Sequence, residues 1–197
     1  MEINVINKVR DLFGEVYVGG SYAVDTILGN DINPKSDIDF YIKNRFITRE
    51  MLKAVIEDVL FKGQRVEFTC DPLGNPGYYK MPNIRKRISV EVWPVGKSGM
   101  FGQIYKTKRY DFMFIEDLDT AYLLKNQAST ATQCCLKLDF SHKGYTQHKT
   151  DYFTKAHGYK LIHLNIHDSW CTVAHKEKLH RKYENYEIVE YSTPRIK

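Results

Sequence analysis

Two aspartates, Asp37 and Asp39, are separated by one isoleucine in the stretch SDIDFYI at residues 36–42. The flanking residues are apolar, and we expect a strand over residues 37–42. Because side chains alternate across a strand, the two carboxylates would point to one face. Carboxylates that close raise each other's pKa unless water solvates them or a cation lies between them. Magnesium would satisfy them, since it prefers oxygen ligands and is commonly held by one or two carboxylates plus substrate phosphates.

A third carboxylate is usually needed where two such ions clamp an in-line displacement at phosphorus. Glu91 is an isolated acid between apolar neighbours in residues 85–95, which we predict to be a strand. We therefore predict Glu91 as the third ligand, with Glu67, in a strand expected over residues 65–70, as its competitor. The alternative is that Asp37 and Asp39 are merely the polar face of an edge strand, because so short a pattern is common.

A pair of glycines precedes the aspartates, at the end of another predicted strand, residues 15–18. Gly19 and Gly20 end that strand, and the hydroxyl of Ser21 can cap the helix that follows. Glycine lets the backbone approach a phosphate closely, and the start of a helix presents free N–H groups and a partial positive charge to an anion. The segment therefore predicts a cradle for a triphosphate that faces the aspartate-bearing strand.

Several further elements are expected to position these groups. Apolar spacing predicts helices over residues 4–13 and 48–61. Beyond residue 114 the composition changes: residues 115–138 are predicted to be helical, and the later residues are rich in Tyr, His and Lys. We therefore expect an α/β (α+β) fold, a small mixed β-sheet flanked by helices, over residues 1–112. A mainly helical part is expected over residues 113–197.

Composition narrows the class of protein. The 197 residues are 43% hydrophobic and 27% charged, which is too apolar for disorder. No apolar run approaches the length of a membrane span, the N-terminus does not resemble a secretory signal, and the four cysteines lack the paired spacing of a zinc ribbon. We therefore expect a cytoplasmic protein with no membrane partner. The net charge of +5 suits a phosphate-bearing partner without requiring one, and nothing in the sequence indicates an oligomeric state.

The stretches GGS (residues 19–21) and SDIDF (residues 36–40) together resemble the signature of the polymerase-beta-like nucleotidyltransferase superfamily. Within it, residues 18–29 and the DIDF strand are most similar to the head domain of class II CCA-adding enzymes and bacterial poly(A) polymerases. Those heads usually carry an Arg-Asp pair in this helix, whereas Val24 precedes Asp25 here, with one extra residue after the glycines. The resemblance covers about residues 5–95.

The resemblance implies a magnesium-dependent nucleotidyltransferase with a two-metal mechanism. It would move a nucleoside monophosphate from a nucleoside triphosphate such as ATP to an acceptor hydroxyl, for example an RNA 3′ end such as that of a tRNA. Asp37, Asp39 and Glu91 would be the catalytic residues and would hold two Mg²⁺ ions.

The resemblance also suggests how the nucleotide is bound. The glycines and Ser21 would hold the β- and γ-phosphates. Three cations are candidates for neutralising the phosphates, although each alone is better explained as a solvated surface cation: Lys35, Arg85 and Arg87. Residues 1–112 would form the catalytic domain, and residues 113–197 would select the base or the acceptor.

The acceptor is the least defined part of this interpretation. Tyr, His and Lys interleave through residues 142–159 and 175–186, where rings could stack on bases and lysines could contact phosphates. A tyrosine-rich packing surface with solvated lysines explains the same composition. Two other functions stay open: nucleotidyl transfer to a small molecule or to a protein, as in AMP-adding toxins, and non-catalytic binding of a nucleotide or an RNA.

Overall fold

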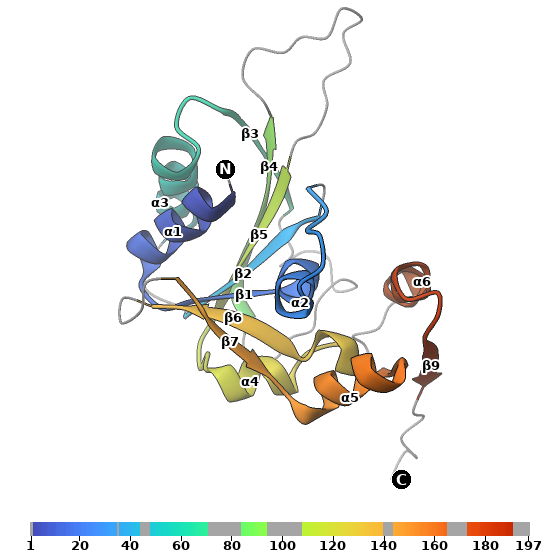
Figure 1. The fold of residues 1–197 in the computed structure, drawn as a ribbon. Coiled ribbons are helices and arrows are strands. Elements are labelled where there is room, and N and C mark those ends of the chain that lie inside the picture. Colours follow the sequence, from blue (N-terminus) through green and yellow to red (C-terminus); the bar gives the residue numbers. More distant parts are fainter. Residues whose placement is uncertain are drawn as a thin grey trace, which may run out of the picture.

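The computed structural model of the chain describes residues 2–34, 36–43, 48–70, 84–93, 108–139, 144–164 and 173–190. Within these ranges a mixed sheet has the strand order β3-β4-β5-β2-β1-β6-β7 (Figure 1). Its strands are β1 (Val16–Gly19), β2 (Ile38–Lys43), β3 (Arg65–Cys70), β4 (Ile84–Trp93), β5 (Lys108–Ile115), β6 (Cys134–Leu138) and β7 (Thr146–Lys149). A second sheet pairs β8 (Leu161–Leu164) with β9 (Glu187–Glu190) in parallel.

Helices and helical turns connect and cover the strands. They are α1 (Glu2–Phe13), α2 (Gly20–Leu28), α3 (Arg49–Val55) with its π-helical continuation η1 (Ile56–Leu60), α4 (Thr120–Lys125), the 3-10 turn η3 (Thr130–Thr132), α5 (Asp151–Tyr159) and α6 (Val173–Lys182). Polar side chains start three of them, because Thr48, Asp119 and Thr150 each accept a hydrogen bond from a backbone N–H of the first turn. None of the described helices is long and apolar enough to cross a membrane.

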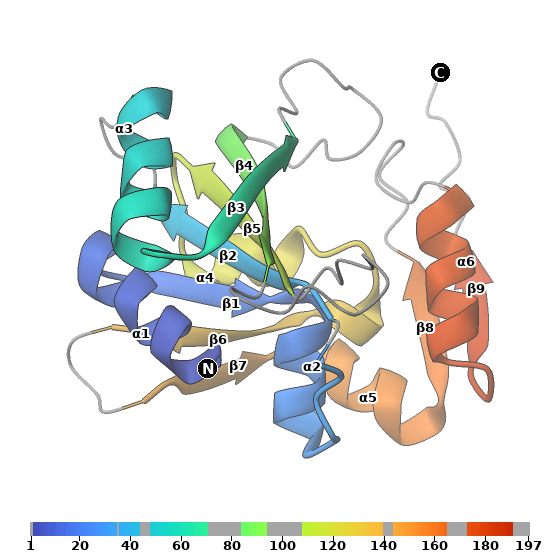
Figure 2. The same ribbon diagram turned by 90° about the horizontal axis from the view of Figure 1, so that it is seen from above.

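Two hydrophobic cores lie on opposite faces of the large sheet. On one face, α1, α2 and α3–η1 pack against strand side chains such as Phe40 and Phe112. On the other face, α4 packs against a smaller set that includes Tyr41 and Met113. Strand alternation explains the division, since Phe40 and Tyr41 are neighbours in β2 and point to opposite faces. Figures 1 and 2 show α1 and α3 together on the side of the sheet away from α4.

The predicted α/β fold is confirmed. The structure has the mixed sheet flanked by helices, and it has strands and helices at each of the N-terminal positions that the sequence indicates. These elements were predictable because their apolar spacing is local and regular.

The predicted mainly helical C-terminal part is not confirmed. Residues 115–138, expected to be one helix, contain α4, η3 and the strand β6. β6 pairs antiparallel with β1, with Leu136 opposite Val18, and its side chains alternate between the two cores. Pairing with a buried strand distant in sequence therefore overrides the local helical pattern. The boundary near residue 112 stays a prediction, although β6 and β7 extend the sheet of the N-terminal residues.

Candidate active site

One row of residues crosses four neighbouring strands at the end of the sheet where β1 leads into α2. Gly19 of β1 lies opposite Asp39 of β2, Asp39 lies opposite Asp111 of β5, and Asp111 lies opposite Ser89 of β4. Residues paired in this way share a face of the sheet. It is the face that α4 covers further along the strands, so this face changes from an apolar core to a charged patch toward the start of α2.

Helix α2 begins in direct contact with Asp39. Gly20, its first residue, has φ +64, a conformation that other L residues rarely adopt. A Cβ atom at Gly20 would overlap the Oδ2 atom of Asp39, and one at Gly19 would lie 2.7 Å from Cε2 of Tyr41. The two glycines therefore let the start of the helix, with its free N–H groups, lie against a carboxylate.

The surroundings of Asp39 disfavour the charged form of its carboxyl group. Burial raises the pKa of Asp39 to about 7, the nearby charges of Asp111 and Asp37 add to the rise, and those of Lys178 and Arg87 oppose it. Among the described residues, none donates a hydrogen bond to this carboxylate. A buried acid in this condition becomes charged readily only when a cation lies beside it.

Asp111 is buried and is bound by two arginines. Nη2 of Arg87 donates to its Oδ2 at 3.1 Å, and Nε of Arg109 donates to its Oδ1 at 3.3 Å. Nη2 of Arg109 also donates to the Ser89 hydroxyl at 3.3 Å. Arg87, one of the predicted phosphate-binding cations, thus lies within this charged patch. Asp111 was not predicted from the sequence. Its segment nevertheless shows the pattern that led to the prediction of Glu91, which is a single acid within an apolar strand.

Glu91 lies on the same face but further from the aspartate-bearing strand. It pairs with Arg109 on one side and with Glu67, its predicted competitor, on the other. Because β5 lies between β4 and β2, Glu91 is two strands from Asp39, whereas Asp111 is on the adjacent strand.

The acids of the charged patch differ in how well they fit a magnesium ion. Within the described ranges, no three His, Cys, Asp or Glu side chains gather closely enough to hold a metal ion. The chemistry of the donors still fits magnesium: Asp37 and Asp39 offer carboxylate oxygens two residues apart, and the half-buried Asp39 accepts no hydrogen bond from the residues that the structure describes. Asp111 could bind the same metal ion as Asp37 and Asp39 only if the ion shared its carboxylate with Arg87 and Arg109 or replaced their hydrogen bonds to it.

The other predicted phosphate ligands are placed differently. Ser21 is half-buried in the first turn of α2, directly after the glycines. Arg85 is exposed and forms an ion pair with Glu116 near the opposite end of β5, so the structure does not bring it to the charged patch. Lys35 lies outside the described residues.

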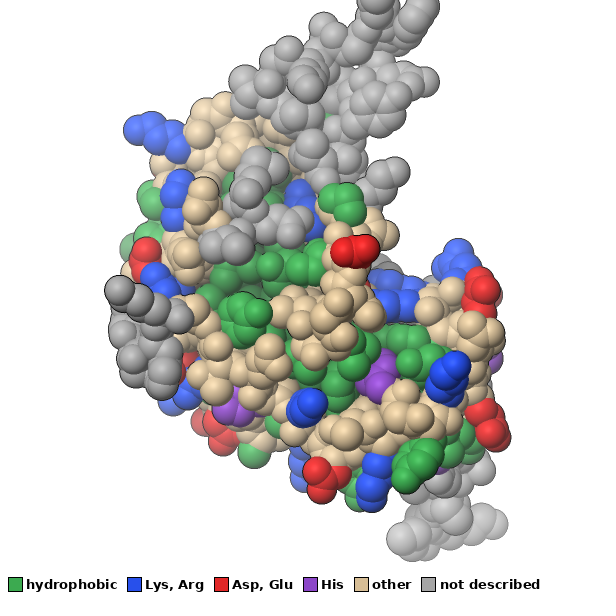
Figure 3. Space-filling view, viewed as in Figure 1, with side chains coloured by type: hydrophobic (Ala, Val, Ile, Leu, Met, Phe, Trp, Pro, Cys, Tyr) green, Lys and Arg blue, Asp and Glu red, His purple; other side chains and the backbone are tan. Residues whose placement is uncertain are grey.

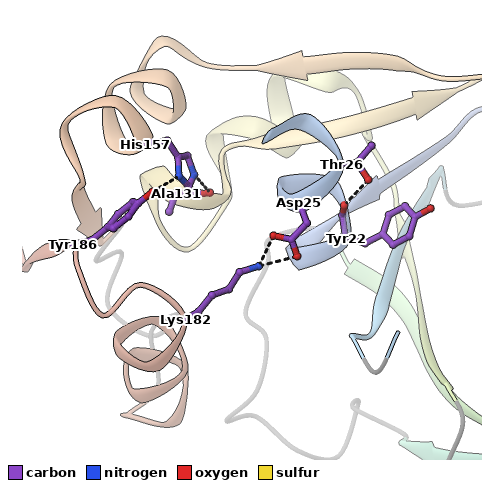
Figure 4. A network of polar contacts seen from close by, with 7 residues as sticks. All are labelled: Tyr22, Asp25, Thr26, Ala131, His157, Lys182 and Tyr186. Atoms are coloured by element: carbon purple, nitrogen blue, oxygen red, sulfur yellow. Dashed lines mark hydrogen bonds and ion pairs between the residues drawn. The ribbon is translucent and has the colours of Figure 1, made fainter. Parts of the chain in front are cut away.

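Helix α6 brings two lysines to α2, and no sequence motif indicated this. Nζ of Lys182 donates to both oxygens of the buried Asp25, at 3.1 and 3.2 Å (Figure 4). Lys178 lies one turn earlier on the same side of α6, and its charge lowers the pKa of Asp39. The ion pair ties the end of α6 to α2, and Lys178 acts electrostatically on the acid that contacts Gly20.

We expect the Asp25–Lys182 pair to stabilise the fold. Replacing Lys182 with methionine leaves a buried carboxylate without its cation, which should lower the free energy of unfolding by about 1–3 kcal/mol. The double variant with Asp25→Asn should lose at least about 1 kcal/mol less than the sum of the two single variants. Urea unfolding measures all three.

The exposed Arg85–Glu116 pair provides the matched control for that experiment. Both side chains are about half exposed, so Arg85→Met should change the free energy of unfolding by less than about 1 kcal/mol. Additive effects of Asp25→Asn and Lys182→Met would show that the two groups do not interact in solution.

Comparison with solved structures identifies the fold. The Thermotoga maritima CCA-adding enzyme complexed with tRNA matches 97% of this chain with a TM-score of 0.55 and 16% identity. A CCA-adding enzyme in complex with CTP matches 96% with a TM-score of 0.54 and 16% identity, and a tRNA-processing enzyme complex matches 94% with a TM-score of 0.53 and 13% identity. This chain spans only 39%, 40% and 43% of the length of these three proteins.

No family model and no curated protein matches the sequence. The structural likeness shows that the chain shares the fold of these enzymes, as the resemblance of the glycine and aspartate motifs predicts.

Proposed function

We propose that this protein is a magnesium-dependent nucleotidyltransferase that moves a nucleoside monophosphate from a nucleoside triphosphate to a hydroxyl at an RNA end, such as the 3′ end of a tRNA. The observation that carries the proposal is the contact between Gly20, at the start of α2, and Asp39, with a second acid in register on β5. Two solved structures with this fold are of CCA-adding enzymes in complex with tRNA and with CTP, which supports these substrate classes.

The start of α2 is the proposed binding site for the triphosphate. The backbone N–H groups of Gly20 and Ser21 are in the first turn, where they have no acceptor within the helix and can donate to phosphate oxygens. Lys178 of α6 and Arg87 of β4 act electrostatically on the Asp39 carboxylate and so lie close enough to offset the negative charge of phosphates bound there. This arrangement would orient the α-phosphate toward the acids.

Asp37 and Asp39 would hold two magnesium ions together with a third carboxylate. When bound, magnesium would supply charge stabilisation at the α-phosphate and activation of the acceptor hydroxyl. The acceptor oxygen bonds to the α-phosphorus while the bond to the β-phosphate oxygen breaks, and pyrophosphate leaves. We propose Asp111 as the third carboxylate because its strand is adjacent to β2, and Glu91, predicted from the sequence, is the alternative.

Paired substitutions decide between these two acids. We expect Asp111→Asn to lower the rate of transfer about 100-fold or more, because it removes a charge beside Asp39. Glu91→Gln should leave most of the activity, since Glu91 is one strand further away. Steady-state kinetics over a magnesium titration measure both variants. A larger loss in Glu91→Gln than in Asp111→Asn, with both proteins folded by circular dichroism, would favour the assignment from the sequence.

A labelled-nucleotide assay tests the function as a whole. The protein is incubated with magnesium, each α-³²P-labelled nucleoside triphosphate, and separate pools of tRNA and protein, and pyrophosphate release is followed in parallel. Label in the tRNA pool, dependent on magnesium, is the expected result. Label in the protein pool would instead indicate a protein acceptor, and nucleotide binding without pyrophosphate release would indicate a non-catalytic protein.

A further inference from the structure

A cavity of about 430 Å³ lies between α5, η3 and β8, apart from the acids of the sheet. Its size is in the range of sites that bind a small molecule or a single nucleotide. The large sheet is not among its linings, which come from the segment around η3, from α5 and from β8. Nothing in the proposed phosphate and metal site uses this cavity.

Two exposed tyrosines and a lysine from α5 form one side of the cavity. Tyr152 is 65% exposed and Tyr159 is 78% exposed, unusual values for rings of this size in a folded domain. Tyr152, Lys155 and Tyr159 are spaced by three and four residues, so they share one face of the helix. The two tyrosines are therefore about 10 Å apart along the helix axis, with Lys155 between them in the sequence.

The rest of the cavity wall includes apolar side chains. Ala156 of α5 and Leu164 of β8 line it and are buried. Two polar groups of the wall are held by internal hydrogen bonds: the Thr130 hydroxyl accepts from the backbone N–H of His163 at 3.0 Å, and the side-chain Oε1 of Gln133 accepts from the Thr150 hydroxyl at 3.0 Å. The cavity thus combines buried apolar side chains with aromatic rings that are largely exposed.

The charge around the cavity suits an anionic ligand. Lys155 lines it, and the exposed Lys149 and Lys160 flank α5, whereas no acid is among the described residues that line it. Figure 3 shows lysine, histidine and apolar side chains on the part of the surface that α5 and its neighbours form, together with some acidic ones. Flat rings beside cations are the usual means of holding unpaired bases and their phosphates.

We propose that this cavity binds an unpaired nucleotide of a single-stranded RNA, with a base stacked on Tyr152 or Tyr159 and a neighbouring phosphate on Lys155. The inference rests on the proposed function, because it gives the acceptor strand a binding site of its own. A protein partner would find only two separated rings here, whereas a base needs one ring face and a nearby cation, which the cavity offers.

The position of the cavity fits an acceptor strand. η3 contacts α2 on one side and α5 and β8 on the other, so a single helical turn separates the cavity from the helix that begins at Gly20. The backbone carbonyl of Ala131 in this turn also accepts a hydrogen bond from Nε2 of His157 in α5 at 3.1 Å, which links α5 to η3 (Figure 4). A strand held at α5 therefore lies one layer from α2.

Fluorescence anisotropy with a labelled single-stranded RNA of about eight nucleotides, without nucleotide or magnesium, tests the proposal. Replacing Tyr152 and Tyr159 together with leucine should weaken binding at least about tenfold, because it removes both stacking surfaces. The matched double phenylalanine variant keeps the rings and should bind like the wild type. Tyr145→Leu, which removes an exposed ring that does not line the cavity, should also bind like the wild type.

Two results would overturn the proposal: wild-type affinity in the double leucine variant, or equal competition by an RNA duplex, whose bases are already stacked. Measuring RNA binding and nucleotidyl transfer in the same variants distinguishes failure of this proposal from failure of the proposed function. Ring-dependent RNA binding without nucleotidyl transfer to any acceptor would support the cavity and refute the enzyme. Normal transfer to RNA by the double leucine variant, with unchanged KM for the RNA, would refute the cavity and support the enzyme.

Discussion

Replacing Asp39 with asparagine is expected to abolish nucleotidyl transfer and, in the same protein, to raise the melting temperature at pH 8. Transfer is lost because the variant removes a proposed metal-binding charge that contacts the start of α2. Stability is gained because burial and the neighbouring acids raise the pKa of Asp39 to about 7, so its charged form is unfavourable in the folded protein. Such opposite effects are characteristic of an active site rather than of a structural acid.

The direction of the pH dependence follows from that pKa. The folded-state pKa lies above the value of the unfolded chain, 3.8, so between about pH 4 and pH 7 the folded protein binds more protons than the unfolded chain. Raising the pH through this window therefore lowers the contribution of Asp39 to the stability of the wild type, by on the order of 4 kcal/mol. Asparagine does not titrate, so the variant should lack this loss and should gain a few degrees at pH 8 but not at pH 4.

Thermal unfolding at pH 4, 6 and 8, with and without magnesium, measures these effects beside the transfer assay. Magnesium should raise the melting temperature of the wild type at pH 8 and should have little effect on Asp39→Asn. Asp31→Asn removes an exposed acid and is the control for a general change in net charge. Unaltered transfer in Asp39→Asn, or an equal gain in stability at every pH, would contradict the role given to Asp39.

Gly20→Ala should cause the second large loss. The methyl group would overlap Oδ2 of Asp39 and would occupy a backbone conformation, φ +64, that alanine rarely adopts. The Asp39 side chain, α2 or β2 must move, each of which would separate the helix start from the carboxylate, and we expect transfer to fall about 100-fold or more. The free energy of unfolding should also fall by about 1–3 kcal/mol.

Gly29→Ala is the matched control for that variant. Gly29 has φ +70, but nothing lies within 4 Å of a Cβ atom there, so alanine introduces the same backbone strain without the contact. It should lose about 1–2 kcal/mol of stability and keep wild-type transfer. If Gly20→Ala and Gly29→Ala transfer nucleotide equally well, the close approach of α2 to Asp39 has no catalytic role.

The features that the sequence predicted correctly are local ones. Asp37, Asp39 and the glycines lie within about twenty residues of one another, and the two strands and one helix that carry them follow from regular apolar spacing and glycine positions. Their contact required only that β1 and β2 pair with each other, which consecutive strands usually do.

The features that the sequence could not predict depend on contacts between distant segments. Asp111 is placed beside Asp39 only because β5 pairs in parallel with β2, and a sequence does not state which strands are neighbours. Glu91 has the same local pattern, so periodicity could not choose between them. Lys182 and Asp25 are 157 positions apart, and nothing in the composition of α6 distinguished its lysines from solvated ones.

The long reach of α6 back to α2 has a consequence for the order in which this molecule is made. A ribosome-bound chain that ends before residue 173 would already contain the glycines and acids of the charged patch, but not Lys178 or Lys182. The proposed triphosphate site would lack the charge of Lys178 until α6 had emerged and docked. Under the proposed function, nucleotide transfer would therefore begin only late in the synthesis of the chain.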